Sequence, residues 1–160
     1  MFSDGVVHIN ESLKVMSKEN LKEKIKMHEG FRSMIYLDSL GKKTIGFGHL
    51  IVHEDKFVEG KEYSKEELTE LFNKDFNKGW DSMINFCEIN NLRSISDTAK
   101  EILCEMIFQM GYSGVGKFKN MIKALQNRDY KLAGTEMLDS RWAKQTPNRA
   151  NELSDHMASA

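Results

Sequence analysis

The most constraining feature of this sequence is a long amphipathic segment that begins at Ser64. Ser64 and Glu67 have the spacing of a capping box, which marks the start of a helix. Apolar side chains then recur at helical spacing along one face, at Leu68, Leu71, Phe72, Phe76, Trp80, Met83 and Ile84. A helix of about twenty residues exceeds the usual length. Only a helix that reaches between two lobes, or lies across one large lobe, needs that length, and Gly79 is a position at which it can bend.

A β-hairpin is predicted in front of this helix. Residues 33–37 and 44–47 are rich in β-branched and aromatic side chains, and residues 39–42 between them have the composition of a turn. A short third strand is predicted over residues 50–53. Before the hairpin, apolar positions at helical spacing predict a helix over residues 18–29, which a glycine follows.

The second half of the chain has helical patterns throughout. The expected elements are a helix over 96–110 that stops at Gly111, helices over 114–126 and 128–138, a turn around 141–142, and a last helix with Thr146 as N-cap and Pro147 at its first position. Strands near the start and helices elsewhere predict an α+β fold, mostly helical.

The expected organisation is an N-terminal arm over 1–17 followed by one domain over 18–160. Within the domain we expect a small lobe with the hairpin over about 30–63, a connecting helix over about 64–86, and a larger helical lobe over about 87–160 that includes the helix 18–29. We expect a substrate to lie in the groove between the lobes.

Composition excludes several classes of protein. Lys plus Arg (23) nearly balances Asp plus Glu (24), so the net charge is −1 and nothing indicates a nucleic-acid partner. No apolar run is long enough for a membrane span, and the N-terminus lacks the pattern of a signal peptide. Cys87 and Cys104 fit neither a disulfide framework nor a metal motif, and a buried free thiol is expected at Cys104. We expect no metal, no cofactor and a monomer.

Three polar residues around the predicted hairpin form a candidate catalytic set: Glu29, Asp38 and Thr44. Glu29 closes its helix, where the negative end of the helix dipole favours a protonated acid. A hairpin can place Asp38 and Thr44 across from each other with a water between them. An acid, a base and a water holder are what glycoside cleavage requires. Each residue also has an ordinary reading, as an exposed helix-end glutamate, a turn aspartate and a strand threonine.

Two further pairs are hypotheses. His49 follows the second strand and is ordinarily structural, but Asp75 on the long helix could pair with it. Arg149 lies in the dense polar stretch 140–150 and could form an ion pair with Glu29 across the groove.

These segments together resemble the phage-type lysozymes, glycoside hydrolase family 24. The matching stretches occur in the family's order over about residues 18–150, and they are 28–30, 35–38, 44–50, 71–75, 108–111 and 140–150. The gaps of eight residues between Glu29 and Asp38, and of five between Asp38 and Thr44, match as well.

The resemblance implies hydrolysis of the β-1,4 bond between N-acetylmuramic acid and N-acetylglucosamine in bacterial peptidoglycan, with inversion. It implies that Glu29 is the general acid and that Asp38 and Thr44 position the attacking water. It also implies supporting roles for His49, Asp75 and Arg149. Leu50, Phe108 and Gln109 match positions that contact the substrate. Such an enzyme is made in the cytoplasm and, without a signal peptide, reaches the bacterial cell wall by another route.

The chain also departs from the family pattern. The stretch 50–64 is shorter, Met121 and Glu136 stand where the family supplies polar sugar contacts, and the arm 1–17 is added in front of a truncated tail. We expect the arm to cover core that the missing tail would cover. The leading reading is a bacteriolytic glycosidase. The alternatives are a catalytically weak or inactive peptidoglycan-binding module and a helical interaction protein that uses the long helix as its partner surface.

Overall fold

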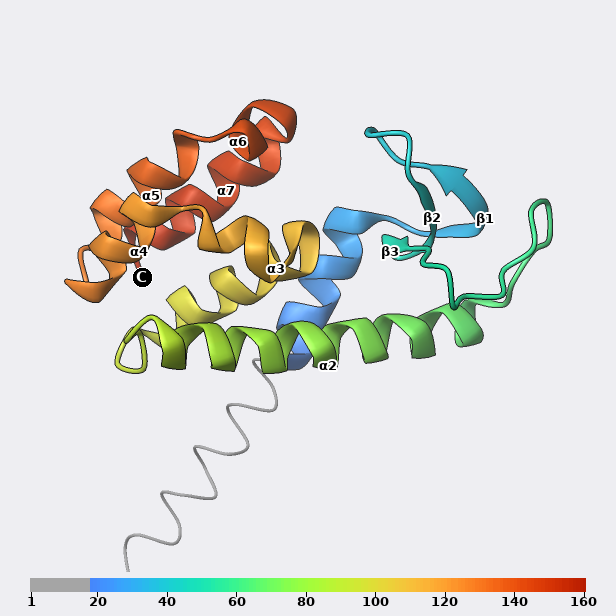
Figure 1. Ribbon diagram of the computed structural model, residues 1–160, viewed down its shortest axis with the longest axis horizontal. Helices are drawn as coiled ribbons and strands as arrows, with labels where there is room; N and C mark the ends of the chain where they lie inside the picture. Colours follow the sequence, from blue (N-terminus) through green and yellow to red (C-terminus); the bar gives the residue numbers. More distant parts are fainter. Residues whose placement is uncertain (1–17) are drawn as a thin grey trace, which may run out of the picture. The chain divides into compact units, whose positions relative to one another are not determined.

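The computed structural model describes residues 18–160, so the expected arm over 1–17 lies outside the described residues. The described chain has a small three-stranded sheet near its start and helices over most of the rest, and the predicted α+β class is confirmed (Figure 1). The chain divides into two compact units, one up to residue 74 and one from residue 75 onward. The boundary between these units falls inside the long helix over residues 65–89.

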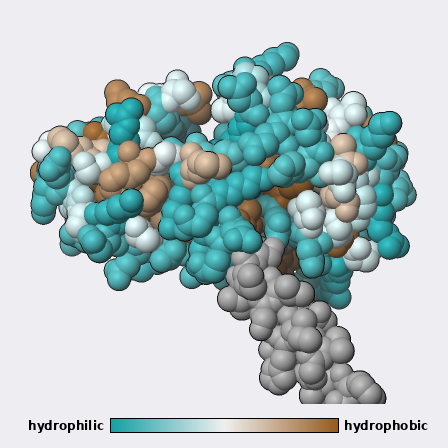
Figure 2. Space-filling view, turned by 180° about the vertical axis from the view of Figure 1, so that it is seen from behind, coloured by the Kyte–Doolittle hydropathy of each residue, from teal (hydrophilic) through white to brown (hydrophobic). Residues whose placement is uncertain are grey.

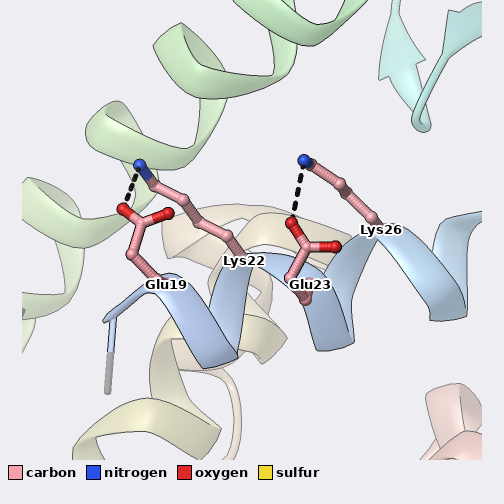
Figure 3. Close-up of polar contacts among 4 residues, drawn as sticks. All are labelled: Glu19, Lys22, Glu23 and Lys26. Carbon is pink, nitrogen blue, oxygen red and sulfur yellow. Dashed lines mark hydrogen bonds and ion pairs between the residues drawn. The ribbon is translucent and has the colours of Figure 1, made fainter. Parts of the chain in front are cut away.

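In the described part of the first unit, residues 18–29 are helical, as expected. Leu21 and Ile25 are buried on one face of this helix. Lys22 forms an ion pair with the exposed Glu19 at 3.2 Å, and Lys26 forms one with the exposed Glu23 at 3.1 Å (Figure 3). Both pairs join residues three apart, which supports a helix modestly.

The helix is followed by an antiparallel sheet in the order β1-β2-β3, with β1 over Arg32–Leu37, β2 over Lys43–Gly46 and β3 over His49–Leu50. The first two strands are the predicted hairpin. The third strand is shorter and earlier than expected, because residues 51 onward leave the sheet for a loop. Between Arg32 and Tyr36 strand β1 bulges, since these residues pair with Gly46 and Thr44.

Phe47, in the turn between β2 and β3, joins the parts of the first unit. Its buried ring lies 5.1 Å from the ring of Phe31 and 5.6 Å from that of Phe72. The Lys26 ammonium lies over both the Phe47 ring, at 5.6 Å, and the Phe72 ring, at 5.4 Å. Aromatic pairs and cation–π contacts of this kind each contribute beyond simple burial. The Phe47 side chain thus connects three parts of the unit: the helix 18–29, the sheet and the start of the next helix.

Helix α2 spans Lys65–Ile89 and begins as its sequence predicts. The Ser64 hydroxyl accepts a hydrogen bond from the Glu67 backbone N–H at 3.1 Å and contacts the Glu67 carboxylate at 3.3 Å. Phe72, Phe76, Met83 and other periodic positions are buried. Helical backbone continues through Gly79 to the end of α2 (Figure 1).

Helix α3 spans Asp97–Gly116 and is capped by Ser96, whose side chain accepts a hydrogen bond from the Ala99 N–H. Gly111 interrupts it with φ 82° and ψ 163°. The predicted stop at Gly111 is therefore a kink, because helical backbone resumes and runs on to Gly116. A positive φ at this point is readily adopted only by glycine.

The remaining helices are α4 over Lys119–Gln126, α5 over Tyr130–Leu138, α6 over Arg141–Gln145 and α7 over Pro147–Ala158. The predicted turn around 141–142 is thus a short helix, and the predicted helix 114–126 begins later. Thr146 does precede α7, but its hydroxyl donates to the Trp142 carbonyl at 3.0 Å and makes no side-chain cap.

Helices α5 and α7 of the second unit approach closely at Gly134. The Ser154 hydroxyl donates to the Gly134 carbonyl at 2.8 Å. A Cβ placed on Gly134 would lie 2.7 Å from the Ser154 carbonyl oxygen, which is backbone and cannot move aside. This crossing therefore requires glycine.

The surface drawn in Figure 2 is largely hydrophilic, with hydrophobic side chains in small separate groups. Within residues 18–160, no helix combines the length and the apolar character that a bilayer crossing requires.

Replacing Gly134 with Ala should lower the free energy of unfolding by about 1–3 kcal/mol, because the new methyl group overlaps the backbone of α7. Urea denaturation followed by circular dichroism measures this change. Gly116→Ala is the matched control, since a Cβ there meets no atom within 4 Å. A loss of stability as large in the control would contradict the steric explanation.

Cys87 and Cys104 are both buried free thiols. Burial raises the pKa of Cys87 from 9.0 to about 11, against the opposing effect of the Lys100 charge. The folded state therefore holds the thiol proton more tightly than the unfolded state does. Its contribution to stability is complete below pH 9 and is lost as the pH rises towards 11.

We accordingly expect stability to fall more steeply between pH 9 and 11 in the wild type than in Cys87→Ala, whose side chain does not titrate. Urea titrations of both proteins across this range measure the two slopes. Parallel slopes would show that the Cys87 thiol is not the group responsible.

Candidate active site

Glu29 is the last residue of the helix 18–29, and Gly30 ends that helix with a φ of 72°. The partly buried Glu29 side chain lies directly on the backbone of Gly48, in the turn between β2 and β3. A Cβ on Gly48 would lie 2.5 Å from Glu29 Oε2 and 2.8 Å from Glu29 Cδ. Gly48 also has a φ of 76°, so both its backbone and its missing side chain make room for the carboxylate.

Asp38 follows β1, and its carboxylate is fixed by the turn. Asp38 Oδ1 accepts hydrogen bonds from the backbone N–H groups of Leu40, at 2.9 Å, and Lys42, at 2.8 Å. This is the turn-forming role that aspartate commonly has. It uses one carboxylate oxygen, and among residues 18–160 no donor bonds to the other oxygen, Oδ2. The turn therefore orients Asp38 and leaves Oδ2 as an acceptor.

Thr44 lies on β2 and is only 4% exposed. Its Oγ1 donates to the Lys42 carbonyl at 3.0 Å, so its single hydrogen is used and the oxygen's lone pairs remain for accepting. The register pairs Thr44 with Tyr36. Leu37 pairs with Lys43 and the Asp38 N–H bonds to the Lys42 carbonyl, so Asp38 lies two residue pairs further along the hairpin. Asp38 and Thr44 are therefore diagonal neighbours and not directly opposite, at a spacing of about 7–8 Å between Cα atoms.

Tyr36 is within electrostatic range of both carboxylates, and sequence reasoning missed it. Burial raises the pKa of its phenol, the nearby Glu29 carboxylate raises it further, Arg32 lowers it, and Asp38 raises it. The phenol therefore stays neutral near pH 7. Its response to both carboxylates places Glu29 and Asp38 within electrostatic reach of one hydroxyl. A tyrosine that faces a threonine across a predicted hairpin was the signal that could have drawn attention to it.

His49 forms a close pair that the sequence did not predict. Its Nε2 lies 2.8 Å from Asp55 Oδ2, and the same oxygen accepts the Val52 backbone N–H at 2.9 Å. The Phe57 ring lies edge-on at 6.2 Å. The loop after β3 thus folds back onto His49. Asp75, the expected partner, is half-buried on α2 in the second unit, and its pairing with His49 stays a prediction.

Arg149, on α7 of the second unit, has a carboxylate partner that was also missed. Its Nε donates to Glu105 Oε2 at 3.0 Å, and both side chains are largely buried. A charged residue inside the apolar run of α3 was the available sequence signal, because a buried charge requires a partner. The expected pair of Arg149 with Glu29 stays a prediction.

The three expected substrate contacts differ in their surroundings. Leu50 pairs with Thr44 across the sheet and is 46% exposed. Phe108 and Gln109 are half-buried on α3 of the second unit. Gln109 Oε1 accepts the Trp142 indole N–H at 2.8 Å, which fixes the amide and directs its NH₂ group away from Trp142. Their roles in binding stay predictions.

The second unit contains a pocket of about 430 Å³. Its lining includes Phe118, Trp142 and Arg141, together with Met121 and Glu136, the two positions that depart from the family pattern. Across residues 18–160 no group of three or more His, Cys, Asp or Glu side chains is placed to hold a metal ion.

Comparison with known proteins gives the family. The model of the phage lysozyme family matches residues 26–158. The chain is 32% identical to the protein named probable T4-type lysozyme 2 of Dictyostelium discoideum, over 84% of this chain and 91% of that protein. It is 29% identical to the pre-baseplate central spike protein Gp5 of Enterobacteria phage T4, over 84% of this chain and 27% of that protein.

The fold and the comparisons define a glycoside hydrolase of the lysozyme type. The chain belongs to the phage lysozyme family.

Replacing Gly48 with Ala should reduce the hydrolytic rate by about 100-fold, because a Cβ there displaces the Glu29 carboxylate. The variant also places alanine at a positive φ, which costs about 1–2 kcal/mol of stability. Gly60→Ala is the matched control, because Gly60 has a φ of 78° and open space around its Cα. Rates normalised to folded protein separate the two effects, and equal rates in both variants would contradict the displacement of Glu29.

Proposed function

We propose that this enzyme hydrolyses the β-1,4 bond between N-acetylmuramic acid and N-acetylglucosamine in bacterial peptidoglycan. Membership of the phage lysozyme family supports this substrate class. The observation that supports the mechanism is the contact of Glu29 with Gly48, in the turn at the end of β2, within the compact unit whose hairpin turn also holds Asp38. Two carboxylates that flank a reacting bond are what most glycoside hydrolases use.

In this mechanism Glu29 is the general acid. Glu29 donates its proton to the glycosidic oxygen as the bond to the anomeric carbon breaks, and the leaving sugar departs with a free hydroxyl group. The close approach to Gly48 limits the directions in which this carboxyl can point.

Asp38 and Thr44 hold the attacking water. The water donates one of its two hydrogens to Asp38 Oδ2, because Oδ1 already accepts the hydrogen bonds of the turn. The water donates its other hydrogen to Thr44 Oγ1. This oxygen can only accept, because its own hydrogen is donated to the Lys42 carbonyl. A lone pair of the water then faces the anomeric carbon. As the water attacks, Asp38 takes its proton, and solvent afterwards returns both carboxyls to their starting states.

A water held by a carboxylate attacks from the face opposite to the leaving group, so we propose inversion of the anomeric configuration. Proton NMR of the first product formed tests this step: an inverting enzyme releases the α-anomer from a β-linked substrate. Initial release of the β-anomer would instead indicate a covalent intermediate on Asp38. We further propose that cleavage of many such bonds lyses bacteria.

Clearing of a peptidoglycan suspension by the wild type and by Glu29→Gln tests the function itself. The variant keeps the shape of the side chain and removes the proton donor, so its rate should fall by about 10²–10⁴-fold. Circular dichroism establishes that both proteins are folded. Glu19→Gln is the matched control, because Glu19 is on the same helix and forms only an exposed ion pair.

Equal clearing by the wild type and Glu29→Gln would place the acid elsewhere. Binding of peptidoglycan without clearing by the wild type would favour a catalytically inactive binding module. A lower rate in Glu19→Gln equal to that of Glu29→Gln would show that the charge of the helix, and not its terminal carboxyl, is responsible.

A further inference from the structure

Arg32 is an exposed cation at the start of β1, the strand that connects Glu29 to Asp38 in the chain. Its guanidinium carbon lies 5.0 Å from the centre of the Tyr36 ring. Tyr36 is in turn the residue whose phenol responds to Glu29, Arg32 and Asp38 together. Among the described carboxylates none forms an ion pair with Arg32. The donor edge of the guanidinium is therefore available while its face is held by the ring.

The bulge in β1 produces this arrangement. In a regular strand, side chains four residues apart are separated by about 13 Å along the strand. From Arg32 to Tyr36 the chain advances four residues while its partner β2 advances only two, from Gly46 to Thr44. The shortened path brings the guanidinium over the ring. The stack restricts a long flexible side chain to one region before any ligand binds.

The charges of the chain indicate what the Arg32 guanidinium could bind. Glu29 and Asp38 are both acids, and the net charge of the chain is −1, so nothing global attracts an anionic polymer. Peptidoglycan carries carboxylates on its peptides, and on the lactyl groups of those muramic acid units that have no peptide. A guanidinium with an open donor edge binds a carboxylate through two parallel hydrogen bonds.

We propose that Arg32, stacked on Tyr36, is a specificity-determining residue that binds a carboxylate of the peptidoglycan beside the bond to be cleaved. This inference rests on the proposed function for its substrate. In it, Tyr36 is a positioning residue that acts through Arg32. The carboxylate belongs either to the lactyl group of muramic acid or to the attached peptide, and the two sources are distinguishable.

Binding in an inactive background tests the proposal without any need for turnover. Soluble glycan strands are prepared in three forms: with their peptides, with the peptides removed by an amidase so that the lactyl carboxylates are free, and with all carboxylates converted to methylamides. Calorimetry then gives the affinity of Glu29→Gln alone and combined with Arg32→Gln. We expect the second change to weaken binding of charged strands by about tenfold and to leave the neutralised strands unaffected.

The form of charged strand that shows the loss identifies the source of the carboxylate. Arg32→Lys should retain part of the affinity, because an ammonium is a point charge without the planar fork. Tyr36→Phe should retain the stack and the affinity, whereas Tyr36→Leu should lose both. Arg93→Gln is the control for charge, since Arg93 is an exposed arginine of the second unit that forms an ion pair with Glu88.

Three results would overturn the proposal: an equal loss on neutralised strands, no loss on either charged form, or no binding of charged strands by Glu29→Gln. A failure of the proposed function would give a different experimental result from a failure of the Arg32 proposal. A wild type that releases no reducing ends from peptidoglycan contradicts hydrolysis, while the difference in affinity between the Arg32 variants still decides the role of Arg32.

Discussion

The packing of Phe47 between Phe31 and Phe72 is the contact on which the geometry of the first unit depends. Phe47 occupies a two-residue turn, and its ring holds that turn against the start of α2 while Lys26 reaches over it from the helix 18–29. The next residue is Gly48, whose bare Cα receives the Glu29 carboxylate. The position of the candidate acid is therefore set by aromatic packing one residue away.

The candidate site combines groups that are fixed with groups that remain able to bond. Asp38 uses one oxygen to close its turn, and Thr44 uses its one hydrogen on the same turn. These hydrogen bonds fix the orientation of the two side chains. They leave Asp38 Oδ2 and Thr44 Oγ1 as acceptors in defined positions. The same logic holds for Arg32, whose face is held by Tyr36 while its donor edge is open. Pre-orientation of this kind lowers the entropy cost of holding a water or a substrate group.

Much of the fold was predictable, because its signals are local. The capping box at Ser64 and the turn before β2 each depend on residues within a few positions. Local signals were less reliable where a competing contact existed. Thr146 has the right place for an N-cap, yet its hydroxyl bonds to the Trp142 carbonyl one turn earlier. Gly111 has the right conformation to end a helix, yet the chain resumes helical backbone after it.

The sequence by itself determined most of the elements, the α+β class, the family resemblance and the candidate set of Glu29, Asp38 and Thr44. Only the tertiary structure decided which charges meet. Arg149 bonds to Glu105, forty-four residues away in the chain, and His49 to Asp55 through a folded loop. The bulge in β1 likewise stacks Arg32 on Tyr36. The physical reason is that periodicity and caps record interactions within one turn or strand, whereas charge pairing depends on how the backbone folds back on itself.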